Sequence, residues 1–167
     1  MEAQPQQLQQ DRSLLEAKMR LEVRARNGSG WFYWIAGLSL INSVIALSGA
    51  TWTFLFGMAI TQVIDGMSLG IQRSAGLQGF NLVSLIALAL DAVVALIVGV
   101  FGYFARKGNQ TVYIFGMVLY ALDAVVTLLF QDWLGFLFHL LALGGLWSGL
   151  AAQRKLTATY GTTSAPT

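Results

Sequence analysis

Hydrophobic side chains dominate five stretches of the chain, and short polar or glycine-containing segments separate these stretches. They cover residues 31–48, 52–71, 82–105, 112–130 and 133–152. A helix rises about 1.5 Å per residue, so stretches of this length can cross a hydrocarbon core about 30 Å thick. A helix also satisfies its own backbone hydrogen bonds, which lipid cannot do. The pattern therefore predicts an all-α integral membrane protein.

Polar residues lie at both ends of this hydrophobic region. Residues 1–30 are expected to form a polar, amphipathic, cytoplasmic segment, with a short surface helix over 11–26 that ends at the Asn-Gly-Ser-Gly sequence of 27–30. Residues 31–155 are expected to form the transmembrane bundle, and residues 156–167 a flexible tail. The N-terminal segment lacks the apolar centre and cleavage site of a secretory signal, so the first hydrophobic stretch is expected to stay as an anchor.

Composition agrees with a membrane location and removes several classes of function. Hydrophobic residues make up 56% of the 167 residues and charged residues 11%, whereas a soluble domain carries about 25% charged residues. The few basic residues lie at the ends of apolar stretches, which argues against nucleic acid and favours the lipid bilayer as the partner. The chain has no cysteine, which excludes disulfides, thiolate catalysis and cysteine-bound metals.

The distribution of basic residues favours four crossings of the membrane. Four crossings leave only Arg73 outside and place the remaining basic groups in the cytoplasm, namely those of the N-terminal segment and Arg106, Lys107, Arg154 and Lys155. Cytoplasmic loops carry an excess of positive charge. We therefore expect a multi-pass protein of the cell membrane (plasma or inner) with a cytoplasmic N-terminus.

The second stretch, 52–71, is the least suited to crossing the membrane, because Gln62 and Asp65 lie inside it. An aspartate near the centre of a spanning helix costs about 2.5–3.5 kcal/mol. The expected fold is therefore a bundle of four transmembrane helices plus one re-entrant or interfacial helix.

An internal similarity supports an alternative topology. The hairpin of residues 31–73 resembles that of residues 111–155 in three features, namely a polar residue within an apolar run (Asn42, Asp123), a tryptophan ten residues later (Trp52, Trp133) and a final Gln-Arg pair (72–73, 153–154). If the second stretch also spans, the chain has five spans and an inverted hairpin repeat, which is the design of many transporters.

Ionisable residues inside the hydrophobic stretches are the candidates for a functional site, because charge at bilayer depth is costly. The candidate proton- or ion-binding residues are Asp91, Asp123, Asp65 and His139, and the supporting polar residues are Asn42, Ser39, Tyr120 and Gln62. Helical spacing puts several of them on stripes shared with small residues, where membrane helices approach closely. We expect Asp91 and Asp123 to face the bundle interior, with Asn42 and His139 as partners.

Three functions are compatible with such residues. The first is a structural or accessory membrane protein, in which a neutral or hydrogen-bonded Asp91 holds helices together. The second is a small proton- or cation-coupled transporter or channel that uses the intramembrane acids. The third and weakest is an intramembrane enzyme, suggested by His139 and by the G-x-S-x-G sequence of 66–70. That motif needs a strand-to-helix turn, and this stretch has the pattern of a helix, so the sequence favours a protein that is not an enzyme.

The sequence indicates no cofactor and no metal site. It contains no phosphate loop, dinucleotide fingerprint or HExxH sequence, and a lone histidine with separated aspartates lacks the spacing of metal ligands. Stripes of small residues that stay uncovered after folding would suit a homo-oligomer or a partner in a membrane complex.

Overall fold

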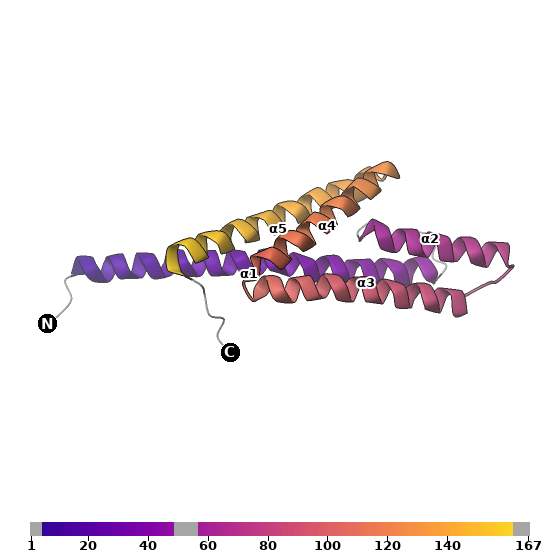
Figure 1. Ribbon diagram of the computed structural model, residues 1–167, viewed down its shortest axis with the longest axis horizontal. Coiled ribbons are helices and arrows are strands. Elements are labelled where there is room, and N and C mark those ends of the chain that lie inside the picture. Colours follow the sequence, from indigo (N-terminus) through magenta and orange to yellow (C-terminus); the bar gives the residue numbers. More distant parts are fainter. Residues whose placement is uncertain (1–4, 49–56, 162–167) are drawn as a thin grey trace.

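The structure, a computed structural model, describes residues 5–48 and 57–161. Within these residues the chain is all-helical (Figure 1). The helices are α1 (Pro5–Leu47), α2 (Ala59–Ser74), α3 (Leu82–Arg106), α4 (Gln110–Leu129) and α5 (Trp133–Tyr160). All except α2 are long and apolar enough to cross a membrane. The expected all-α class is confirmed, and the four long helices are compatible with a multi-pass membrane protein.

The longest helix, α1, packs between α3 and α5, and both neighbours run opposite to it (Figure 1). On the α3 side, the Arg106 guanidinium lies beside the bare backbone of Gly30. On the α5 side, Arg24 Nε donates a hydrogen bond of 2.7 Å to Ser148 Oγ. The first turns of α1 extend beyond the rest of the bundle (Figure 1). The four long helices therefore run alternately up and down, and Arg24 of α1 and Arg106 of α3 lie toward the same end of the bundle.

The expected helix break at 27–30 is wrong, because α1 continues through these residues as one helix of 43 residues. Gly28 and Gly149 let the backbones of α1 and α5 touch, since a Cβ on Gly149 would lie 2.5 Å from Gly28 Cα. One turn away, the bare backbone of Gly145 makes room for the indole ring of Trp31. This close packing outweighs the low helix propensity of glycine. The predicted boundary between the N-terminal segment and the bundle thus lies inside a continuous helix.

Helix α5 also extends further than the hydrophobic pattern indicates. It ends at Tyr160, so the first residues of the expected tail are helical. Neighbouring helices hold this last part of α5, because Gln110 Nε2 of α4 donates to Thr157 Oγ1 at 3.4 Å and Lys18 of α1 lies over the ring of Tyr160. These polar contacts extend the helix beyond the apolar stretch.

The short helix α2 begins beside Ser39 of α1, inside the bundle and not at its end. The backbone N–H of Met58, just before α2, donates a hydrogen bond of 2.8 Å to Ser39 Oγ. Ser39 lies about 12 Å from the end of α1 at Leu47, at about 1.5 Å per residue. The helix has 16 residues and runs from there to the end of the molecule where α3 starts (Figure 1). The first part of the predicted stretch, residues 52–56, lies outside the described residues.

A polar network joins the end of α2 to the start of α3. The side-chain oxygen of Gln72 accepts hydrogen bonds from Asn81 Nδ2 at 2.7 Å and from Ser84 Oγ at 3.2 Å. Gln72 Nε2 donates to Ser68 Oγ at 3.0 Å. Asn81 also caps α3 by accepting from the backbone N–H groups of Val83 and Ser84. The C-terminal part of α2 is thereby fixed against α3 with its buried polar groups satisfied.

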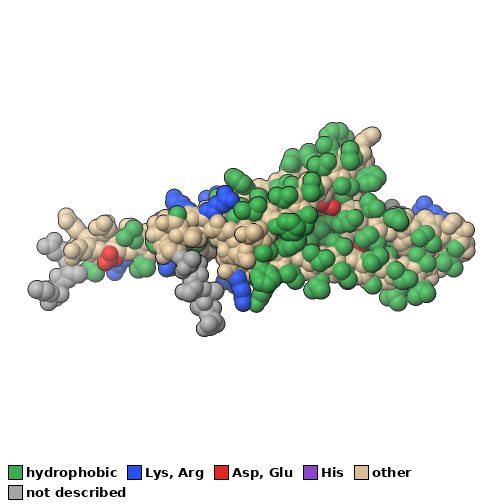
Figure 2. Space-filling model, viewed as in Figure 1, with side chains coloured by type: hydrophobic (Ala, Val, Ile, Leu, Met, Phe, Trp, Pro, Cys, Tyr) green, Lys and Arg blue, Asp and Glu red, His purple; other side chains and the backbone are tan. Residues whose placement is uncertain are grey.

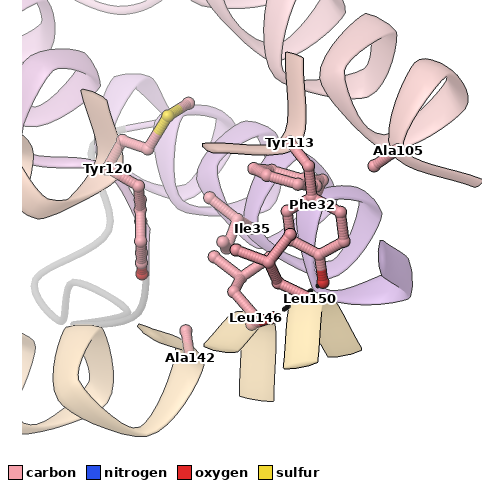
Figure 3. Packing of buried hydrophobic residues seen from close by; sticks show 9 residues of the cluster. Phe32, Ile35, Ala105, Tyr113, Tyr120, Ala142, Leu146 and Leu150 are labelled. Atoms are coloured by element: carbon pink, nitrogen blue, oxygen red, sulfur yellow. Dashed lines mark hydrogen bonds between the residues drawn. The ribbon is translucent and has the colours of Figure 1, made fainter. Parts of the chain in front are cut away.

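Apolar packing fixes the other half of the bundle, where α1, α3, α4 and α5 meet (Figure 3). The rings of Phe32 and Tyr113 meet edge-on with their centroids 5.5 Å apart. The buried Tyr113 hydroxyl donates a hydrogen bond of 2.8 Å to the carbonyl of Leu146. Beyond this cluster α4 and α5 lean away from α1 and α3, and α2 begins in that region (Figure 1). The acids described below lie in this wider part.

The outer surface of the long helices is apolar. Figure 2 shows hydrophobic side chains over most of the visible face, with basic side chains near the extension of α1 and at the far end. Highly exposed examples are Trp34, Leu82, Leu96, Leu129, Leu137 and Trp147. Soluble monomers rarely expose contiguous apolar patches of more than a few hundred Å², so this surface suits contact with lipid.

Candidate functional site

The predicted site residues form two separate groups, rather than one polar layer. Asp65 of α2 and Asp91 of α3 lie together, and Asp123 of α4 lies against His139 of α5 and the start of α2. Asp91 is fully buried, and the Asp123 side chain is 11% exposed. Both acids point into the protein, but they have different partners.

Asp123 caps helix α2 from a neighbouring helix. Its Oδ2 accepts a hydrogen bond of 2.8 Å from the backbone N–H of Ala59, and its Oδ1 accepts one of 3.0 Å from that of Ile60. The residue before the helix, Met58, has no side chain that can cap it. The first N–H groups of a helix lack partners within the helix and carry a partial positive charge. Asp123 therefore satisfies donors of α2 that would otherwise be unpaired inside the bundle.

His139 holds Asp123 in this position. Its Nε2 lies 2.9 Å from Asp123 Oδ2, and its Nδ1 lies 2.7 Å from the carbonyl oxygen of Gly135. A carbonyl only accepts, so Nδ1 carries a hydrogen, and a second proton lies between Nε2 and the carboxyl group. The imidazole stacks on the ring of Tyr120 with centroids 4.6 Å apart. These contacts make Asp123 and His139 a satisfied structural group, and His139 is the partner of Asp123, not of Asp91.

Asp65 and Asp91 form the second group. Asp65 is 3% exposed and Asp91 0% exposed. The two carboxyl groups interact with each other and with the Ser43 hydroxyl of α1. Among the described residues, none donates a well-formed hydrogen bond to any of the carboxyl oxygens, and no basic side chain pairs with them. Two adjacent carboxyl groups in a buried site cannot both be ionised unless a cation lies between them, so without a cation at least one of them holds a proton.

The supporting polar residues take different positions. Ser39 holds the start of α2, and its own hydroxyl donates to the carbonyl of Ile35 at 2.8 Å. Asn42 is buried on α1, and its side-chain oxygen has no hydrogen-bond partner among the described residues. Tyr120 contributes the face of its ring to His139. Gln62 is half-buried on α2. The expectation that Asn42 partners Asp91 or Asp123 is not supported by any described contact.

The pairing of Asp65 with Asp91 was not predicted from the sequence, although a signal for it exists. The buried polar residues of α2 recur at helical spacing and are Thr61, Asp65, Ser68 and Gln72. Such a stripe predicts that one face of α2 packs against protein, and Asp65 lies at its centre. The capping of α2 by Asp123 has no comparable signal, because it depends on where another helix begins in space.

The G-x-S-x-G sequence of 66–70 lies within α2 and is helical throughout. It therefore forms no strand-to-helix turn of the kind that exposes a nucleophile. The Ser68 hydroxyl donates to the carbonyl of Val83 at 3.4 Å and accepts from Gln72. Ser68 thus has a structural position between α2 and α3. Among the described residues, no group of three or more His, Cys, Asp or Glu side chains has an arrangement that could hold a metal ion.

Comparison of the chain with models of protein families, with curated proteins and with solved structures found no match. Function is therefore argued from the geometry of the two groups.

Proposed function

We propose that this chain is a small multi-pass membrane protein that binds a proton or an alkali cation between Asp65 and Asp91, as a coupled carrier or channel does. The observation that supports this is the pair of buried, adjacent carboxyl groups whose oxygens accept no well-formed hydrogen bond and have no basic partner among the described residues. Acids at membrane depth often take part in ion and proton pathways. A carboxyl pair of this kind binds positive charge for simple electrostatic reasons.

In this proposal the four long helices span the membrane and α2 is a re-entrant helix. Three described features support it: α1 ends at Leu47, α2 starts beside Ser39 well inside the bundle, and α2 returns to the same end. The cytoplasmic side is the end with Arg24 and Arg106, since positive charge gathers there. The membrane is the plasma or inner membrane, and the N-terminus is cytoplasmic.

Helix α2 is the part that moves in this proposal. The pair is buried, so exchange with water requires one carboxyl group to move away from the other. Asp65 lies on the short α2, whereas Asp91 lies on the long α3. The start of α2 is held mainly by side-chain contacts to Asp123 and Ser39. A shift of α2 would break these hydrogen bonds and separate the two carboxyl groups, and helix shifts are a known form of switching motion.

The test is ion flux into liposomes that contain the purified protein. A pH-sensitive dye inside the vesicles reports proton entry, and matched sodium and potassium gradients report cation entry. The wild-type protein is expected to conduct one of these ions above the level of empty liposomes. Asp65→Asn and Asp91→Asn each remove one ionisable group at nearly constant volume, and each is expected to reduce flux to that of empty liposomes.

Asp132→Asn is the matched control. Asp132 accepts from the backbone N–H of Gly135 at 2.9 Å and so caps α5, and asparagine caps helices equally well. This variant also replaces one aspartate by asparagine, but outside the buried pair, and it is expected to retain full flux. The proposal is wrong if the wild-type protein carries no proton, sodium or potassium ion, or if Asp91→Asn carries them as the wild type does.

A structural role for the acids is the second candidate, and the capping of α2 by Asp123 favours it. In that case one shared proton would hold α2 to α3, and the protein would conduct nothing. Asp65→Asn and Asp91→Asn would then leave every flux measurement at the level of empty liposomes and would alter only stability. An enzymatic role is less well supported, and Ser68→Ala is expected to leave any flux unchanged.

A further inference from the structure

A groove of about 650 Å³ lies along α1 where α3 ends. Its lining includes two basic side chains, Arg26 and Arg106, and the aromatic and apolar side chains of Tyr33, Trp34, Leu38 and Phe138. The end of the groove that holds the arginines is far along the bundle from Asp91, because Arg106 is the last residue of α3 and Asp91 lies four turns earlier. It therefore needs an explanation of its own.

The two arginines are available to a ligand. The Arg106 guanidinium lies over the ring of Tyr33, 4.7 Å from its centroid, and beside the backbone of Gly30. This contact positions the group while leaving its N–H donors unused, since no described side chain or backbone group accepts from it. Arg26 likewise has no acidic partner among the described residues, and the groove has no acidic lining residue there. Two guanidinium groups facing one groove create a site for an anion.

The apolar part of the groove indicates what kind of anion fits. Leu38 lies three turns further into the bundle than Arg26 on the same helix, and Trp34, between them, is 67% exposed. Tryptophan and tyrosine are enriched at the level of lipid headgroups, and basic pockets between membrane helices bind anionic headgroups. A free phosphate would use only the arginines and would leave the apolar part uncovered.

We propose that this groove binds an anionic phospholipid, with the phosphate between Arg26 and Arg106 and an acyl chain along Trp34 and Leu38. The inference depends on the membrane location of the bundle but not on ion binding by Asp65 and Asp91. A neighbouring groove is less suited to this ligand, although Arg20 and Arg24 line it, because Glu16 lies there too and Arg24 is bonded to Ser148.

Native mass spectrometry of the purified protein tests the proposal. The detergent-solubilised chain is titrated with phosphatidylglycerol and, separately, with phosphatidylcholine of the same acyl chains. We expect saturable binding of one phosphatidylglycerol and weaker, non-saturable binding of phosphatidylcholine. Arg26→Gln and Arg106→Gln are each expected to weaken phosphatidylglycerol binding roughly fivefold, the effect of one basic residue near an anionic lipid surface.

Arg20→Gln is the matched control, because it removes the same charge from the same end of α1 outside the groove. It is expected to bind phosphatidylglycerol as the wild type does. Arg26 is exposed, so Arg26→Gln tests the site without disturbing the packing of Arg106 on Tyr33. For Arg106, the variant Arg106→Lys keeps the charge and is expected to retain more binding than Arg106→Gln.

Two kinds of result would overturn the proposal. In the first, phosphatidylcholine binds as tightly as phosphatidylglycerol, or both glutamine variants bind like Arg20→Gln. In the second, inorganic phosphate at the lipid concentrations used displaces phosphatidylglycerol, which would mean that the groove recognises phosphate without an acyl chain. Failure of ion flux in liposomes would leave this lipid titration unaffected, so the two proposals fail independently.

Discussion

At the scale of single residues, the same side chain has different chemical roles because its partners differ. Asp123 receives two backbone N–H groups and contacts an imidazole. Asp65 and Asp91 have each other and a hydroxyl group. A carboxylate that accepts several hydrogen bonds is stabilised in its charged form. A buried carboxyl pair that accepts no well-formed hydrogen bond instead needs a bound proton or cation. All three acids are largely buried, so their partners separate a structural acid from an ion-binding candidate.

The structural role of Asp123 is testable by replacing it with alanine. Asp123→Ala is expected to reduce the free energy of unfolding by about 2–4 kcal/mol, the sum of a lost helix cap and of the buried His139 Nε2 left without a partner. Asp123→Asn is expected to cost less, because its amide oxygen can still accept from the backbone N–H of Ile60 while its NH2 group donates to Nε2 of His139, so only the N–H of Ala59 loses its partner. Unfolding in mixed detergent micelles measures the stability. Faster hydrogen exchange at Ile60 and the next amides of α2 would identify the loosened element, and equal stability of all three proteins would contradict the role.

At the scale of helices, glycine shows how packing overrides local propensity. Glycine at 28 and 30 predicts the end of a helix, yet α1 continues because Gly28 meets Gly149 on α5. Helix α2 shows the opposite case, since a stretch of hydrophobic residues long enough to span forms only a short helix within the described residues. Its buried face carries the polar side chains of Ser68 and Gln72, which hydrogen-bond to residues of α3 and its cap, and that of Asp65, which lies beside Asp91. Element length thus depends on partners as well as on the residues of the element.

The contact between α1 and α5 makes a second prediction. Gly149→Ala is expected to destabilise the protein by about 1–3 kcal/mol, because a methyl group there would force the two backbones apart. Gly144→Ala on the same helix is the control, since a Cβ at Gly144 meets nothing within 4 Å. The control is expected to be neutral or to stabilise by up to about 1 kcal/mol through helix propensity. Both values come from the same unfolding measurement, and similar effects of the two substitutions would mean that the close contact is unimportant.

The internal hairpin repeat stays a prediction. Of its matched features, Trp52 lies outside the described residues. Gln72 is buried beside Asn81, which precedes α3. Gln153 is buried beside Gly108, which lies in the turn between α3 and α4. The helices α2 and α5 differ greatly in length, so any common origin has been followed by different packing.

At the scale of the whole molecule, the arrangement of charge and apolar surface makes a prediction about topology. Arg73 lies near the end of α2, and Lys107 directly follows α3, so the two residues are at opposite ends of α3. The chain has no natural cysteine, which allows Arg73→Cys and Lys107→Cys to be labelled without further changes. In intact cells a membrane-impermeant thiol reagent is expected to label Arg73→Cys only. Labelling of Lys107→Cys from outside would contradict the four-span topology with a cytoplasmic N-terminus.

The sequence by itself determined the all-helical class, the approximate ranges of α3 and α4 and the polar residues that turn inward. These follow from local physics, because the length and spacing of apolar residues decide which helices lipid accepts and which face each helix buries. Only the tertiary structure decided that α1 runs unbroken past Gly28, that Asp123 caps α2 and that Asp65 meets Asp91. Each of these depends on contacts between residues distant in sequence, and the free energy of such a contact is not encoded in the pattern of either segment alone.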